Sequence, residues 1–259
     1  MVRIQARYFF AEGTLDKPAA WGAICDWLEH VRPGRAVFVD QNEKWLTPRE
    51  LRPRAARMAS RHLRVETDNL IPPNFTYPPN AISVGSGRIG RYNLDRVFIE
   101  SPDSAIQDSL LEALAGCGTL VLSGIFNEDY DRWQNAKDPL IYIHAGRSLE
   151  GLPLISNGMP PPLLQDIVDI SDHPGRYHYD QRGFPETVAG RMWIGPELWK
   201  RLGEDRTEDV LALQDYLVQM QADGTLTLKW NGGLFDNATP VSVQNALRRA
   251  VFMPNDKEK

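Results

Sequence analysis

Acidic and histidine side chains gather in one short stretch, residues 166–180, which reads DIVDISDHPGRYHYD. Carboxylate oxygens and imidazole nitrogens bind transition-metal ions, and a metal-bound water can act as a nucleophile. The candidate ligands are Asp169, Asp172, His173 and His178. No pair has the HExxH or H-x-H spacing of a specific metal motif, so the stretch also fits a polar surface loop. A metal-dependent hydrolase that uses this loop is therefore one hypothesis for the chain.

A formal G-x-G-x-x-G occurs in ISVGSGRIG, formed by Gly85, Gly87 and Gly90. A dinucleotide-binding fingerprint needs a buried strand before the glycines, a helix opened by the last of them, and an acid about 20 residues further on. Here the following segment, RVFIE, favours a strand, and Glu100 comes too early. We therefore expect a glycine-rich hairpin turn between ISV and the RVFIE segment, and no bound cofactor.

Patterns for nucleophilic catalysis are also missing. The chain has no G-x-S-x-G elbow, because Ser86 has glycine on both sides. His144 follows a predicted strand, where a lone histidine is commonly hydrogen-bonded in place. The sequence thus predicts a protein that is not an enzyme.

Acidic and aromatic residues are mixed in FNEDYDRW, residues 126–133. Glu128, Asp129 and Asp131 supply negative charge, and Tyr130 and Trp133 supply large rings. Charge steers a basic partner towards a surface, and aromatic side chains provide anchoring contacts. We predict that these residues bind a partner protein, with a solvated turn as the alternative.

A second acidic cluster, GEDRTED, adds Glu204, Asp205 and Asp209 to the predicted partner-binding residues. Acidic residues also complement the dipole at a helix N-terminus, so this cluster fits a helix start as well. The whole chain has a net charge of -5. An acidic protein suits a basic partner and is not typical of a nucleic-acid binder.

Four arginines fall on one face of a predicted helix that follows Pro53. They are Arg54, Arg57, Arg61 and Arg64. They could bind phosphate groups, but no aromatic residue is interleaved, and a solvated helix surface is the favoured interpretation. We expect no nucleic-acid partner.

The hydrophobic pattern predicts alternating strands and helices. Strands are expected at 2–10, 36–39, 119–122, 140–143, 191–194 and 225–230. Helices are expected to start near residues 16, 47 and 101, and to cover 163–170, 196–202, 208–221 and 240–251, with a short helix or turn at 128–133. This order predicts an α+β protein, with a mixed or antiparallel sheet packed with helices. We expect a single domain over residues 1–259, with a possible sub-boundary in the proline-rich loop 69–80.

The remaining features concern location. The first residues, MVRIQARYFF, carry arginines inside the apolar run, and no apolar segment approaches the ~18 residues of a membrane span. Cys25 and Cys117 form no C-x-x-C pair and are expected to be buried free thiols. We expect a cytoplasmic protein with no membrane partner and no metal.

The C-terminal third is the most distinctive part of the chain. It contains GRMWIGPELWKRLG, then ADGTLTLKWNGGLFDN, and then the amphipathic segment PVSVQNALRRAV. The strand with Trp193, the nearby Trp199, the strand 226–230, and Phe235 before the last helix carry a resemblance. In this order they resemble the immunity protein 52 family of bacterial polymorphic-toxin and type VI secretion systems.

The resemblance implies a single α+β protein that binds and neutralises one cognate toxin. Toxins paired with this family are often nucleases of the restriction-endonuclease fold. Such a nuclease needs a basic surface to hold DNA, which an acidic inhibitor would complement. We therefore predict a non-catalytic immunity protein whose partner is a basic nuclease, a type VI secretion effector.

Overall fold

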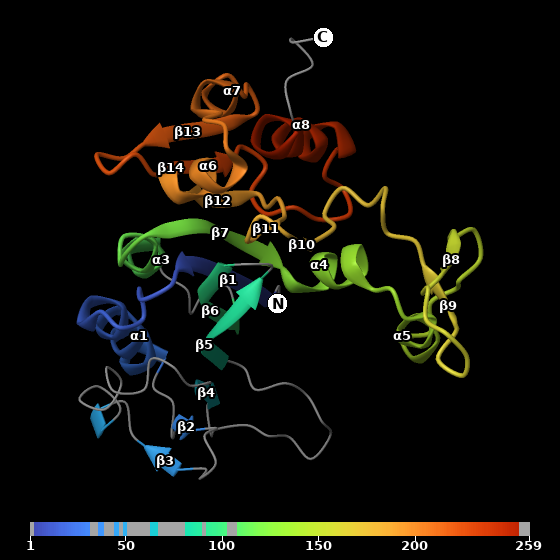
Figure 1. Cartoon of the computed structure of the whole chain (residues 1–259), viewed down its shortest axis with the longest axis horizontal. Coiled ribbons are helices and arrows are strands. Elements are labelled where there is room, and N and C mark those ends of the chain that lie inside the picture. Colours follow the sequence, from blue (N-terminus) through green and yellow to red (C-terminus); the bar gives the residue numbers. More distant parts are fainter. Residues whose placement is uncertain are drawn as a thin grey trace.

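A large antiparallel sheet with helices on both faces forms the body of the protein (Figure 1). The computed structural model describes residues 3–31, 36–38, 44–46, 49–50, 63–66, 81–89, 92–102 and 108–253. The predicted α+β class is confirmed. The loop 69–80 and the arginines Arg54, Arg57 and Arg61 lie outside the described residues, and Arg64 lies in a strand.

The sheet has eight strands, and each neighbouring pair is antiparallel. In spatial order they are β13 (Tyr216–Met220), β14 (Leu226–Trp230), β12 (Arg191–Ile194), β7 (Leu120–Asn127), β1 (Arg3–Ala11), β6 (Tyr92–Pro102), β5 (Ala81–Ile89) and β4 (Leu63–Glu66). The first strand of the chain therefore lies in the middle, between β7 and β6. A separate hairpin pairs β2 (Ala36–Phe38) with β3 (Lys44–Leu46).

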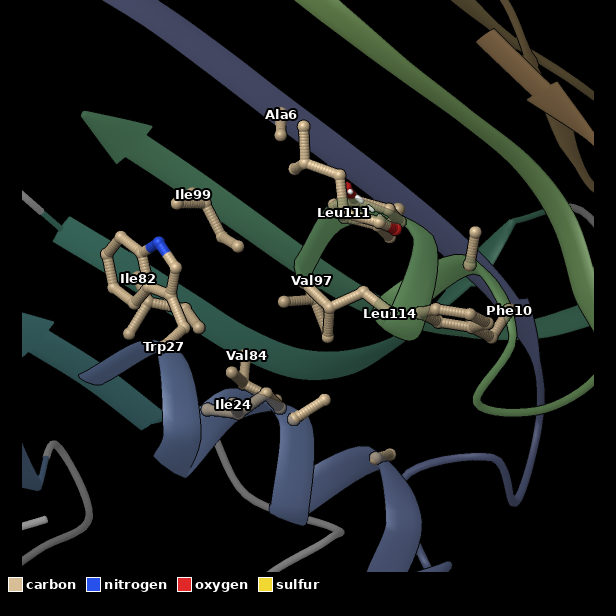
Figure 2. Close-up of a cluster of buried hydrophobic side chains, with 14 of the residues drawn as sticks. Ala6, Phe10, Ile24, Trp27, Ile82, Val84, Val97, Ile99, Leu111 and Leu114 are labelled. Carbon is tan, nitrogen blue, oxygen red and sulfur yellow. Dashed lines mark hydrogen bonds between the residues drawn. The ribbon is translucent and has the colours of Figure 1, made fainter. Parts of the chain in front are cut away.

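Helices α1 (Pro18–Val31) and α3 (Asp108–Ala115) contribute to the core on one face of the sheet. The helical spacing predicted for the first helix is confirmed, because Ala20, Ile24 and Trp27 are all buried. Figure 2 shows side chains from both helices converging on those of the strands. The labelled strand residues in this core are Ala6, Phe10, Ile82, Val84, Val97 and Ile99.

The other face packs against four later helices. They are α4 (Glu128–Asn135), α6 (Pro196–Leu202), α7 (Thr207–Leu211) and α8 (Val241–Phe252), and the hairpin of β10 (His178–Asp180) and β11 (Phe184–Glu186) lies with them. Leu247 and Val251 of α8 are fully buried in this second core. The predicted strands at 191–194 and 225–230 and the helices at 196–202 and 240–251 are confirmed to within a residue at each end.

A register shift in β1 lets one segment of β7 serve both cores. Phe9 pairs with Leu122, but Phe10 pairs with Leu120, so Val121 is an extra residue in the ladder. Leu120 thereby joins the core under α1, while Leu122 joins the core under α8.

The glycine-rich stretch forms a hairpin with the segment that follows it, as predicted, but Gly85 and Gly87 lie within strand β5 and not in the turn. β5 pairs with β6 from Ala81 opposite Glu100 to Ile89 opposite Tyr92. A Cβ atom on Gly87 would lie 2.5 Å from a guanidinium nitrogen of Arg96, so the glycine makes room for this side chain. The stretch does not have the strand-to-helix geometry of a dinucleotide site.

The strand predicted at 140–143 is wrong, because this segment is part of helix α5 (Pro139–His144). Asp138 caps the helix by accepting a hydrogen bond from the Leu140 N–H at 2.9 Å, and Pro139 lies in its first turn. His144 consequently lies at a helix end and not at a strand end.

Two predictions of helix are also corrected. Residues 163–170 contain the strand β9 (Asp166–Val168), which pairs with β8 (Leu154–Ser156). Short apolar runs do not distinguish a strand from a helix, and pairing with β8 decided the outcome. Ser101 and Pro102, predicted to start a helix, end strand β6 opposite β1.

The helix predicted over 208–221 divides into two elements. Helix α7 ends at Leu211, and β13 begins at Tyr216 and pairs with β14. Apolar residues at helical spacing misled the prediction, because Leu217 and Met220 are exposed rather than buried. Tertiary pairing with β14 overrode the periodicity.

Gly195 lies where the end of β12 meets β7. A Cβ atom there would lie 1.9 Å from the backbone oxygen of Leu120, which cannot move without disturbing the sheet. We expect Gly195→Ala to destabilise the protein by about 2–3 kcal/mol in urea unfolding. Gly22→Ala in α1 is the matched control, because no atom lies within 4 Å of its new Cβ. The control should be stabilising by about 0.5–1 kcal/mol, and equal effects would contradict the close approach at Gly195.

Candidate protein-binding site

Two of the three acidic residues of α4 are paired with arginines within the chain. Glu128 lies 2.5 Å from the guanidinium of Arg3, and the bidentate partner of Asp131 is Arg7. Burial raises the pKa of the Glu128 carboxyl, and the Arg3 cation opposes this rise. Both arginines come from β1, so these ion pairs fasten α4 to the middle of the sheet.

The two aromatic residues of this cluster are buried. The Tyr130 hydroxyl forms a hydrogen bond with the Gln244 side chain of α8, and burial raises its pKa. Trp133 donates from its indole N–H to Asp129 at 3.1 Å. Of the five predicted partner-binding residues on α4, only Asp129 is exposed. Contact of these five residues with a partner stays a prediction. The four residues other than Asp129 make contacts within the chain that hold α4 in place.

The second acidic cluster connects α6 to α7 and is more accessible. Glu204 pairs with Arg206 at 2.5 Å, and Asp205 accepts a hydrogen bond from the Thr207 N–H. Asp209 follows in the first turn of α7. The cluster lines a cavity of about 650 Å³. In Figure 1, α7 lies at the top beside α8 and β13, whereas α4 lies near the centre, so the two acidic clusters occupy different places.

The structure does not bring together the candidate metal ligands of the alternative hydrolase hypothesis. Asp169 caps the Ser171 N–H, which lowers the pKa of its carboxyl. The His173 ring bonds to the Gln134 carbonyl, and His178 lies 3.4 Å from Glu186. Asp172 is exposed. Across the described part of the chain, no group of three His, Cys, Asp or Glu side chains could hold a metal ion.

A projecting lobe is the feature that the sequence analysis missed. It comprises residues 136–170, with α5 and the β8–β9 hairpin, and extends from the body beyond α4 (Figure 1). Its small core joins Ala136, Tyr142, Val168 and Ile170 to Trp133. The rings of Trp133 and Tyr142 lie 5.1 Å apart, so α4 anchors the lobe.

The surface of the lobe is strongly apolar. The exposed large hydrophobic residues are Leu140, Ile141, Ile143, Leu154, Ile155, Met159, Leu163 and Leu164. Leu140 and Ile143 are each 57% exposed, because α5 turns only Tyr142 inward. Such a concentration of apolar side chains on a single protruding unit is typical of a surface that another molecule covers. The apolar runs LIYI and PPPLL could have indicated this surface in the sequence. Their neighbouring prolines made them look like ordinary strand and loop segments.

The remaining expectations concern membranes and thiols. Among the helices of the described ranges, none is long and apolar enough to cross a membrane. Cys25 is a buried free thiol, as predicted, while Cys117 is a free thiol of intermediate exposure.

Comparisons with known proteins give a likeness to a solved structure. No protein-family model matches this chain, and no curated protein matches its sequence. Among solved structures, the Pseudomonas aeruginosa T6SS (type VI secretion system) protein PA0821 is similar, with a TM-score of 0.57 and 9% sequence identity. The likeness covers 96% of this chain and 73% of that one. At this identity it shows a shared fold, and no family model confirms the resemblance to immunity protein 52.

Proposed function

We propose that this chain is a non-catalytic immunity protein of a type VI secretion system that binds and neutralises a cognate effector. The observation that carries the proposal is the apolar surface of the projecting lobe. Buried aromatic and aliphatic anchors supply most of the affinity in protein complexes, and this lobe presents eight large apolar side chains. The fold shared with a T6SS protein and the resemblance of the C-terminal third support the same system.

The partner in this proposal is a basic protein, such as a nuclease effector. The net charge of -5 favours a basic partner, and the exposed carboxylates Asp129, Glu204 and Asp205 would steer it. The lobe would then supply the desolvated contact and cover the active cleft of the effector. The chain performs no covalent step in this scheme.

The lobe variant Leu140→Ser, Ile143→Ser, Leu163→Ser and Leu164→Ser tests the proposal. All four side chains are more than half exposed, so their removal should leave the fold intact. Tagged full-length protein is first used to recover the partner from cells that express it natively, and mass spectrometry identifies the partner. With the purified pair, we expect the lobe variant to raise the Kd by at least about 100-fold. It should also fail to protect cells that produce the effector.

Val241→Ser combined with Met253→Ser is the matched control, because both are exposed apolar residues of α8 or its end. This control should bind as the wild type does. Recovery of no secretion effector from cells shown to express such loci would contradict the proposed function. Unchanged affinity of the lobe variant would exclude the lobe as the interface, and flotation of the protein with liposomes would assign the lobe to lipid.

A further inference from the structure

The edge of the sheet at β13 has an unused row of backbone hydrogen-bonding groups. Gln221 donates to Thr225 and Asn231 donates to Asp215, so the odd-numbered residues of β13 face β14. In an antiparallel ladder the intervening residues point the other way. The N–H and C=O groups of Tyr216, Val218 and Met220 therefore point outward, where no described residue forms a backbone hydrogen bond with them.

Nothing in the sequence of β13 protects this edge. The strand reads YLVQM and has no charge, proline or bulge, which are the devices that usually blunt an edge strand. Two of its apolar side chains are exposed, with Met220 at 62% and Leu217 at 55%. An edge with these properties can accept an added strand.

An acidic cavity lies at the end of the same strand. It has a volume of about 650 Å³ and is lined by Met220 and Gly224 on one side and by residues of α6 and α7 on the other. The ionisable lining residues are Glu204, Asp205, Glu208, Asp209 and Arg206. Arg206 is buried and paired with Glu204, so negative charge dominates.

A buried tryptophan forms part of the cavity wall. Trp199 lines the cavity and is 6% exposed, and its indole N–H has no hydrogen-bond partner among the described residues. A buried donor of this kind costs free energy unless it is satisfied.

We propose that the β13 edge and this acidic cavity bind an extended, basic segment of a protein partner. The segment adds a strand to the sheet through Tyr216, Val218 and Met220 and places an arginine or lysine among the carboxylates. Charge selects this occupant over a second copy of the chain. Residues 212–224, which a second copy would present at the edge, contain no lysine or arginine and include Asp215 and Asp223.

This surface is separate from the projecting lobe, and the test uses no native partner. Isotope-labelled full-length protein is titrated with a short acetylated peptide of alternating threonine and valine that carries one central arginine. A second peptide has glutamate in place of arginine. We expect the arginine peptide to give saturable shifts of the Tyr216, Val218 and Met220 amides and to slow their hydrogen exchange. The glutamate peptide should bind at least about tenfold more weakly.

Two variants divide the proposal into its parts. Val218→Pro removes one outward N–H that the ladder does not use, which an edge strand tolerates, and should abolish binding of both peptides. Glu208→Lys should remove the preference for arginine, whereas Glu150→Lys on the lobe, the matched charge reversal, should not.

Each contrary result has a defined meaning. The absence of saturable shifts with either peptide overturns the proposal, and binding unaffected by Val218→Pro overturns strand addition. Equal binding of the two peptides overturns the role of the acidic cavity. Shifts of the same amides that grow with protein concentration alone assign the edge to a second copy. None of these results bears on the binding of the effector by the lobe, because the lobe is tested with the purified effector and the β13 edge with peptides.

Discussion

Arg248→Met is expected to destabilise the protein by about 3–5 kcal/mol, because it leaves buried polar groups without their partner. Arg248 lies on α8 and is 1% exposed. Its guanidinium contacts the Glu186 carboxylate at 2.5 Å and donates to the carbonyls of Pro174 and Arg176 at 3.1 and 2.8 Å. Burial lowers the pKa of this guanidinium, with the nearby Arg176 cation adding to the effect and Glu186 opposing it.

These contacts hold the segment before β10 and the strand β11 against α8. A double-mutant cycle isolates the charge pair from the carbonyl bonds. We expect Glu186→Gln in the Arg248→Met background to cost less than it does alone, with a coupling energy of about 1–3 kcal/mol. Urea unfolding followed by tryptophan fluorescence gives the free energies.

Arg182→Met is the control for loss of a cation. Its ion pair with Asp180 is solvated, since the Arg182 side chain is 47% exposed. A pair of this kind contributes at most about 1 kcal/mol. Equal destabilisation by Arg182→Met and Arg248→Met would contradict the conclusion that the buried contacts of Arg248 hold strand β11 against α8.

Local signals in the sequence were sufficient for much of the C-terminal half. Pro196 at a helix start and the apolar stripe of Val243, Leu247 and Val251 predicted α6 and α8 correctly. Where an apolar run was short, the same signals failed. Residues 140–143 have strand-like composition, yet Asp138 followed by Pro139 is a helix start, and this capping signal was the better guide.

No local sequence pattern could predict which residues surround the acidic side chains of α4. The sequence predicted a short helix or turn at 128–133, and its mixture of acids and rings indicated a surface patch. Asp131 is instead paired with Arg7, which is 124 positions away in the sequence. That contact depends on β1 lying directly beside β7, a property of the order of strands in the sheet. The role of the lobe was hidden for the same reason, since its exposure depends on what the body leaves uncovered.

Trp133→Ala is expected to release the projecting lobe from the body while the sheet stays folded. The ring of Trp133 packs on Tyr142, and the Arg147 guanidinium lies 3.7 Å from its centroid. Removal of a buried tryptophan costs about 3–5 kcal/mol, which a core of only a few residues such as Val168 and Ile170 cannot absorb. The lobe should therefore unfold locally, whereas the two large cores are untouched.

Hydrogen exchange followed by mass spectrometry separates local from global unfolding. We expect residues 138–170 of Trp133→Ala to lose protection and β1 and β7 to keep it. Trp133→Phe is the matched control, because it keeps an aromatic ring against Tyr142 while it loses the hydrogen bond to Asp129 and part of the ring area. Simultaneous loss of protection in β1 would show that the lobe and body unfold as one unit. If the lobe is the interface, Trp133→Ala should also lose effector binding although none of the exposed lobe side chains has been changed, and Trp133→Phe should retain it.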